Sequence, residues 1–173
     1  MSDYKTGLRN IDDLDRDLHI GFVVAEFNAQ YTNEIERVNR EFFENEGFQN
    51  IDTFSVPGAF ELPGFAKRLI ETEEYDLIIA IGVVIRGDTP HFDYVCGESA
   101  RGIMDLNLMY DVPTIFAVLT CNTEDQVKPR IGPNFAIVIF ELGTRPGHPG
   151  KTCSQRQTTR NRWSPLGTVS TTS

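Results

Sequence analysis

The sequence predicts an α/β fold in which a parallel β-sheet is covered by helices on both faces. From residue 18 to about residue 125, apolar segments of strand length alternate with segments of helical periodicity, as in consecutive βαβ units. The strand segments are apolar throughout rather than at every second position, which is typical of parallel strands buried on both faces. With 173 residues, the chain is long enough for one domain with a full hydrophobic core.

The first predicted strand and helix span residues 18 to 47. Residues 18–25 are continuously apolar, which indicates a buried strand. Asn33 is followed three residues later by Glu36, a spacing that resembles a capping box and predicts the start of a helix. Apolar residues then recur at helical spacing until Gly47, which is expected to end the helix.

The next elements follow directly. Ile51–Val56 is predicted to be a second, short strand, and residues 57–63 form the turn after it. Pro63 stands near the first turn of a second helix, a position that proline favours. Leu77–Ile85 is the third predicted strand and the most apolar one. The inner stripe of the second helix consists of Phe65, Ala66, Leu69 and Ile70.

A third helix and a fourth strand complete the regular pattern. We expect the helix over residues 94–109 and the strand over residues 114–119. Pro129 and Pro133 then interrupt the segment in which the next helix should lie. Residues 136–142 are apolar again, and their pattern fits either a strand or a short buried helix.

Composition divides the chain into three regions. Residues 1–17 are expected to be a polar arm, residues 18–142 the domain, and residues 143–173 a disordered tail rich in Gly, Pro, Ser, Thr and Arg. The net charge is −9, but residues 142–173 hold five basic and no acidic residues, so that segment is +5 and the remainder −14. Such an acidic domain is a poor candidate for binding nucleic acid.

Neither a leader nor a membrane span is visible. The polar start lacks the apolar core of a signal peptide, and the longest apolar runs are much shorter than a membrane span. Cys96, Cys121 and Cys153 lack metal or redox spacing, and a sparse, odd count is typical of reduced thiols. We therefore expect a cytoplasmic protein with no membrane partner.

Chemistry-bearing residues follow the strands at the point where each strand ends. Ligands bind parallel sheets at the carboxyl ends of their strands, so these segments should meet at one edge. The sequence therefore predicts one pocket there. The segments are residues 27–28, 58–61, 87–91 and 120–122.

The loop after the third strand holds the best candidates for acid/base chemistry and anion binding. His91 can take and return protons near neutral pH, or it can be a loop histidine that only makes a hydrogen bond to a backbone group. Arg86, Gly87, Asp88 and Thr89 can form an anion cradle, or Gly87 can simply serve the turn.

Four residues elsewhere can each be interpreted either as ligand-binding or as purely structural or surface residues. Phe27 and Phe116 can sandwich a planar ring or belong to the core. Glu61 can bind polyol hydroxyls or cap the following helix. Arg130 can clamp a phosphate or remain a solvated surface residue. The sequence contains no glycine-rich phosphate loop and no metal-ligand cluster.

Four motifs occur in the order and spacing of a known enzyme family: VVAEFN at residues 23–28, VPGAFELP at 56–63, GVVIRGDTPHFDYVC at 82–96 and IFAVLTCNTEDQ at 115–126. Over residues 18–132 the chain resembles the 6,7-dimethyl-8-ribityllumazine synthase family. The resemblance implies a flavodoxin-like three-layer sandwich with a central parallel sheet of about four strands. It also implies a homopentamer or an assembly of pentamers, with active sites shared between neighbouring subunits.

The resemblance implies a reaction as well. The family condenses 5-amino-6-ribitylaminouracil with 3,4-dihydroxy-2-butanone 4-phosphate, releases phosphate and water, and uses no cofactor. His91 would relay protons, and Phe27 would stack on the pyrimidine. Phe116 would close the pocket from the adjacent subunit. The other substrate-binding residues implied are Ala59, Phe60 and Glu61 at the ribityl-uracil, Val83, Val84 and Ile85 at the ring, and Asp88, Thr89 and Arg130 at the phosphate.

The sequence departs from the family pattern after Gly132, and Val138 stands where the family usually has a lysine near the phosphate. Two alternatives to an active enzyme therefore remain. One is a catalytically impaired relative that binds riboflavin-like or ribityl-pyrimidine ligands. The other, a flavodoxin-like electron carrier, would need FMN to copurify, and the first strand is not followed by a phosphate loop.

Overall fold

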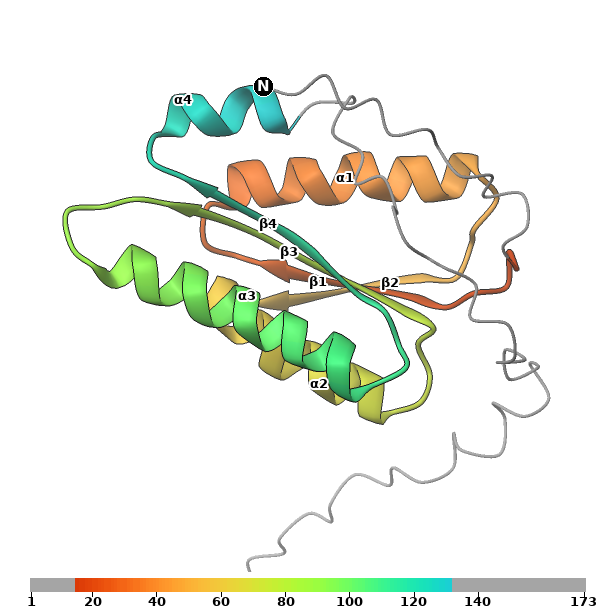
Figure 1. Cartoon of the computed structure of the whole chain (residues 1–173). Helices are drawn as coiled ribbons and strands as arrows, with labels where there is room; N and C mark the ends of the chain where they lie inside the picture. The colour runs from red at the N-terminus through yellow and green to blue at the C-terminus, as the bar shows by residue number, and fades with distance from the viewer. Residues whose placement is uncertain (1–14, 132–173) are drawn as a thin grey trace, which may run out of the picture. The chain divides into compact units, whose positions relative to one another are not determined.

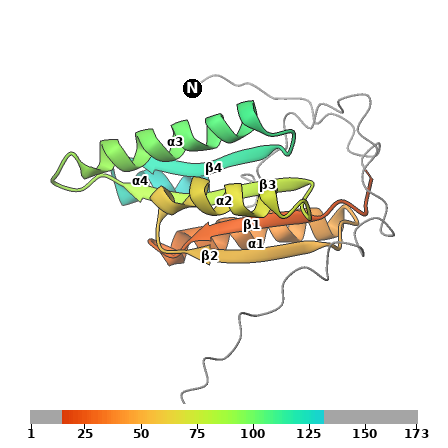
Figure 2. The same cartoon turned by 90° about the horizontal axis from the view of Figure 1, so that it is seen from below.

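The computed structural model describes residues 15–131, and within them four strands form one parallel sheet in the order β2-β1-β3-β4. The strands are β1 (Ile20–Ala25), β2 (Ile51–Val56), β3 (Leu77–Ile85) and β4 (Thr114–Cys121). Helices α1 (Ala29–Asn45) and α4 (Glu124–Val127) lie on one face, and α2 (Leu62–Glu71) and α3 (His91–Met109) on the other (Figures 1 and 2). The predicted α/β fold with a parallel sheet and helices on both faces is confirmed.

Two hydrophobic cores, one on each face of the sheet, hold these layers together. Because successive strand residues point to opposite faces, Phe22 and Ile79 pack towards α1, whereas Val23 and Ile78 pack towards α2 and α3. All six residues of β1 and the first seven of β3 are buried, which explains their continuous apolar sequence. The edge strand β2 is mostly exposed or half-buried.

Helix α1 begins five residues earlier than predicted, because its N-cap is Asn28 and not Asn33, so the expected capping box at Asn33 is wrong. Asn28 precedes the helix in the left-handed conformation, with φ 64°, and its carbonyl accepts the backbone N–H groups of Tyr31 and Thr32. Asn33 lies inside the helix with its side chain exposed. Gly47, with φ 90°, follows the helix end as expected.

The elements around β4 also differ from the prediction. Helix α3 begins at His91 rather than at residue 94, and β4 runs on to Cys121. After β4 come α4 and the 3-10 turn η3 (Lys128–Arg130), which contains Pro129. The predicted segment 136–142, the predicted tail and most of the predicted polar arm lie outside the described residues.

His19 closes the amino-terminal end of the sheet through contacts with two neighbouring elements. Its Nε2 lies 2.8 Å from Oδ2 of Asp52 and its Nδ1 lies 2.9 Å from the carbonyl oxygen of Glu74. The hydroxyl of Tyr75 donates to the same Asp52 oxygen at 3.0 Å, and the His19 and Tyr75 ring centroids are 4.5 Å apart. Burial and the hydrogen bond to Asp52 raise the pKa of Tyr75, so the phenol remains a donor.

Candidate active site

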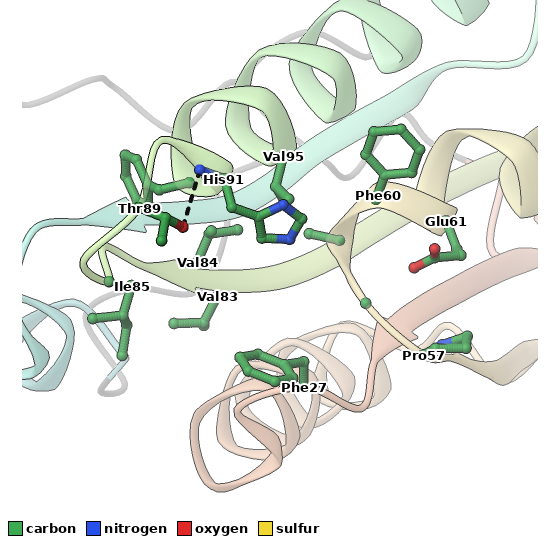
Figure 3. A pocket seen from close by; sticks show the side chains of 14 residues that line it. Phe27, Pro57, Phe60, Glu61, Val83, Val84, Ile85, Thr89, His91 and Val95 are labelled. Atoms are coloured by element: carbon green, nitrogen blue, oxygen red, sulfur yellow. Dashed lines mark hydrogen bonds between the residues drawn. The ribbon is translucent and has the colours of Figure 1, made fainter.

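A pocket of about 540 Å³ lies at the carboxyl ends of β1, β2 and β3 (Figure 3). Nine of the twelve predicted site residues line it, and the three that do not are Asp88, Phe116 and Arg130. The structure thus brings together side chains from three strand ends, as the topology of a parallel sheet requires. The lining is mainly apolar, and its ionisable side chains are those of Glu61 and His91.

The wall formed after β2 is anchored through a glycine in β3. A Cβ atom added at Gly82 would lie 3.2 Å from Cβ of Ala59 and 3.2 Å from Cδ1 of Leu62, so the glycine lets this turn pack closely on the sheet and a larger residue would crowd it. Ala59 is consequently buried and begins the 3-10 turn η2 (Ala59–Glu61). Phe60 and Glu61 follow the buried alanine and remain exposed at the pocket.

Glu61 does not cap α2, so that alternative is wrong. The residue occupies the N-cap position, but its side chain makes no capping hydrogen bond. Its carboxylate lies on the wall opposite Val83 in Figure 3. Carboxylate oxygens there can accept hydrogen bonds from the hydroxyls of a ligand.

Phe27 is held at the pocket by its backbone rather than by packing of its ring. Its N–H donates to the carbonyl of Pro57 at 3.1 Å, and the next residue, Asn28, donates from Nδ2 to the carbonyl of Val83 at 2.8 Å. These bonds fix the end of β1 to both neighbouring strand ends. Phe27 as a residue is 71% exposed, and its ring faces the pocket, where it offers a flat apolar surface (Figure 3).

His91 is the first residue of α3, a 19-residue helix, and its ring points into the pocket (Figure 3). Its backbone N–H lies 3.4 Å from Oγ1 of Thr89, which also lines the pocket. Free N–H groups and the helix dipole favour negative charge at such a terminus. A titratable ring, a hydroxyl and a partly positive helix end therefore stand together.

Three predicted residues lie away from the pocket of their own chain. Asp88 is exposed in the loop before α3. Phe116, 43% exposed on the outer strand β4, does not form a sandwich with Phe27 within one chain. Arg130 donates from Nη1 to the carbonyl of Gln126 at 2.5 Å in η3.

Some residues at the pocket were missed from the sequence, namely Pro57, Phe92 and Val95. Phe92 and Val95 are one and four residues after His91, on the first turns of α3. A helix start placed at His91 would have indicated Val95, because residues four apart lie on the same face of a helix, whereas the spacing gives no such signal for Phe92.

Other catalytic chemistries find little support in the described chain. Burial is the main cause that raises the pKa of Cys96, so its thiol is protonated at neutral pH and is a poor nucleophile. Among residues 15–131, no group of three or more His, Cys, Asp or Glu side chains could hold a metal ion. None of the described helices combines the length and apolar character needed to span a bilayer.

Comparisons with known proteins agree on one family. A family model described as 6,7-dimethyl-8-ribityllumazine synthase matches residues 17–142, which extends beyond Gly132, where we expected the resemblance to end. The chain is 47% identical over 121 residues to a Parabacteroides distasonis protein of that name, covering 69% of this chain and 76% of the relative. It is 43% identical over 131 residues to a Thermococcus onnurineus protein of the same name, covering 72% and 86%.

Proposed function

The chain belongs to the 6,7-dimethyl-8-ribityllumazine synthase family of riboflavin-biosynthesis transferases, and we propose that the pocket behind Phe27 and His91 carries out the family's reaction. The single observation that supports this assignment is the convergence of an exposed aromatic ring, a carboxylate and an imidazole in one pocket of about 540 Å³. Pockets of this size hold small molecules, and a few polar groups in an apolar wall orient them.

The ribitylaminouracil would bind between the three strand ends. Its pyrimidine would stack on Phe27, and its ring edge would meet backbone groups of Val83, Val84 and Ile85. Ala59 and Phe60 would border the bound molecule, and Glu61 would accept hydrogen bonds from the ribityl hydroxyls. The exposed Phe27 ring supports this pose, since an apolar surface of that size gains free energy when a ligand covers it.

His91 would move the protons of the condensation. The substrate amine attacks the ketone and water leaves to give an imine, phosphate is eliminated, and the second amine closes the ring with loss of another water. Each step transfers a proton to or from nitrogen, oxygen or carbon, which an imidazole can do near neutral pH. Holding two reactants side by side supplies a further large part of the acceleration.

The phosphate would lie at the amino-terminal end of α3, near Thr89 and Asp88. Arg130 lies away from the pocket of its own chain and so would reach the phosphate in a neighbouring subunit. Phe116 would close a neighbour's pocket in the same way, consistent with its exposure on the outer strand. Both assignments require a neighbouring subunit, and we propose the pentamer that is usual for the family.

Shared sites can be tested by mixing two impaired variants, each altered at a different residue. We expect His91→Ala and Phe116→Ala subunits, refolded together in equal amounts, to regain activity, because about a quarter of the sites then receive both native residues. Lumazine formation measures the recovery, and native mass spectrometry gives the subunit number. Activity no higher than the mean of the two separate variants, or a monomeric mass, would exclude a shared site.

A catalytically impaired relative that only binds ribityl-pyrimidines is the second candidate. The observation that favours it is the changed sequence after Gly132, including Val138 where the family usually has a lysine.

The cytoplasmic location expected from the sparse cysteines also stays a prediction.

The activity itself separates the two candidates. We expect the full-length chain, mixed with both substrates, to form the lumazine faster than the substrates do without protein, as followed by its absorbance. Heat-denatured protein is the control. Tight binding of the ribitylaminouracil in calorimetry without any rate increase would establish the impaired relative instead.

A further inference from the structure

We propose that Arg86 is a positioning residue that clamps the first turn of α3 to the sheet and so holds His91 at the pocket. The inference rests on the function proposed above, because it concerns how that pocket presents its groups. Arg86 follows the last residue of β3, and its N–H donates to the carbonyl of Cys121 at 2.9 Å. This bond continues the contact between β3 and β4, so the backbone of Arg86 is fixed to the sheet.

All three guanidinium nitrogens of Arg86 bond to neighbouring elements. Nη1 and Nη2 donate to Oδ2 and Oδ1 of Asp93 at 3.1 and 2.6 Å, and Nε donates to Oδ1 of Asn122 at 3.0 Å. A two-pronged bond of this kind fixes the orientation of the carboxylate as well as its distance. Because Asp93 belongs to the first turn of α3, the bond orients the turn that begins with His91.

The guanidinium also contacts a residue of the pocket. Its Cζ lies 4.1 Å from the ring centroid of Phe92, a distance typical of a cation–π contact, and Phe92 lines the pocket. Arg86 therefore holds the two residues that directly follow His91. The backbone N–H of Arg86 donates to Cys121, so this N–H is not available to the anion cradle considered for residues 86–89.

The loop offers little else to hold the start of α3. Residues 86–90 are all exposed, and a Cβ atom added at Gly87 would meet nothing within 4 Å. Pro90 occupies the N-cap position without a side-chain capping bond, and the contact between Thr89 and His91 is long at 3.4 Å. The Arg86 contacts are the short polar links from this loop to the rest of the fold.

This arrangement predicts a loss of rate without a matching loss of stability. The hydrogen bond from Arg86 lowers the pKa of Asp93, so the carboxylate is charged at neutral pH. Exposed ion pairs contribute little to stability. A displacement of about 1 Å at a reacting group, in contrast, can cost about a hundredfold in rate.

The test compares two clamp variants with a matched control on the same helix. Arg86→Gln and Asp93→Asn are each expected to lower kcat about five- to tenfold, with KM changed by less than about twofold and Tm by less than about 2 °C. The double variant should lose no more than either single one, because both remove the same contact. Arg101→Gln is the control, since Arg101 pairs with Glu98 and Asp105 outside the pocket.

A second arm asks whether the clamp acts through His91. In a His91→Ala background, adding Asp93→Asn should lower kcat by less than about twofold, because the group being positioned is gone. If Asp93→Asn lowers kcat by the same factor with and without His91, the proposal is overturned. It is also overturned if kcat is unchanged in both single variants, Arg86→Gln and Asp93→Asn.

Amide hydrogen exchange gives a readout that does not depend on activity. The peptide covering residues 87–95 should exchange faster in Arg86→Gln and Asp93→Asn than in the wild type, and at the wild-type rate in Arg101→Gln. Unchanged exchange in the clamp variants would overturn the clamp even in an active enzyme. If the wild type forms no lumazine, the proposed function fails, while the exchange rates still decide the clamp.

Discussion

Replacing His91 with alanine is expected to lower kcat about a hundredfold and leave a measurable rate. The loss follows from removing a proton-transfer group that points into the pocket. The residual rate follows because the pocket still holds both reactants together. Steady-state lumazine formation measures the change. Since the His91 side chain is exposed, Tm should change by less than about 2 °C.

His91→Gln separates proton transfer from hydrogen bonding. The amide can donate and accept hydrogen bonds but cannot exchange a proton near neutral pH, so it should be as slow as alanine. A glutamine variant with the wild-type rate would show that His91 only bonds the substrate, and an unaltered alanine variant would remove it from the mechanism.

The sequence was sufficient for the architecture because its signals are local. The bounds of β2 and β3 match the prediction, since their apolar runs end at sharp changes of composition. The start of α1 was misplaced because Asn33 and Glu36 have the spacing of a capping box wherever they stand in a helix. The actual start depends on Asn28, whose side chain bonds Val83 on another strand, 55 residues away.

The composition of the site was predictable to the extent that strand topology dictates it. Parallel strands bring Phe27, Glu61 and His91 to one edge, and the structure places all three at the pocket. Val95 was not linked to His91 because the helix was started three residues late. Phe116 and Arg130 cannot be explained by one chain, since neither lies at the pocket of that chain. The link from Arg86 to Asp93 was also hidden, because charges seven residues apart across a loop have no fixed geometry until the loop is built.

Phe27→Ala is expected to weaken binding of the ribitylaminouracil by roughly 5- to 150-fold. Stacking of a flat heterocycle on an aromatic side chain contributes about 1–3 kcal/mol, which corresponds to that range. Phe27 is 71% exposed, so the fold does not depend on its side chain and Tm should change little. Calorimetric titration with the ribitylaminouracil alone, without the butanone phosphate, measures the affinity separately from the chemistry.

Two further variants at Phe27 distinguish stacking from simple apolar contact. Leucine keeps apolar bulk but has no ring face, so Phe27→Leu should recover only a small part of the lost affinity, whereas Phe27→Trp should recover most of it. Because the N–H of Phe27 donates to Pro57 whatever the side chain, all three variants keep the same backbone anchor. Equal affinities for the wild type and Phe27→Ala would place the pyrimidine elsewhere in the pocket. The carboxylate of Glu61 and the backbone of Val83–Ile85 would then have to orient it without a stacking partner from this chain.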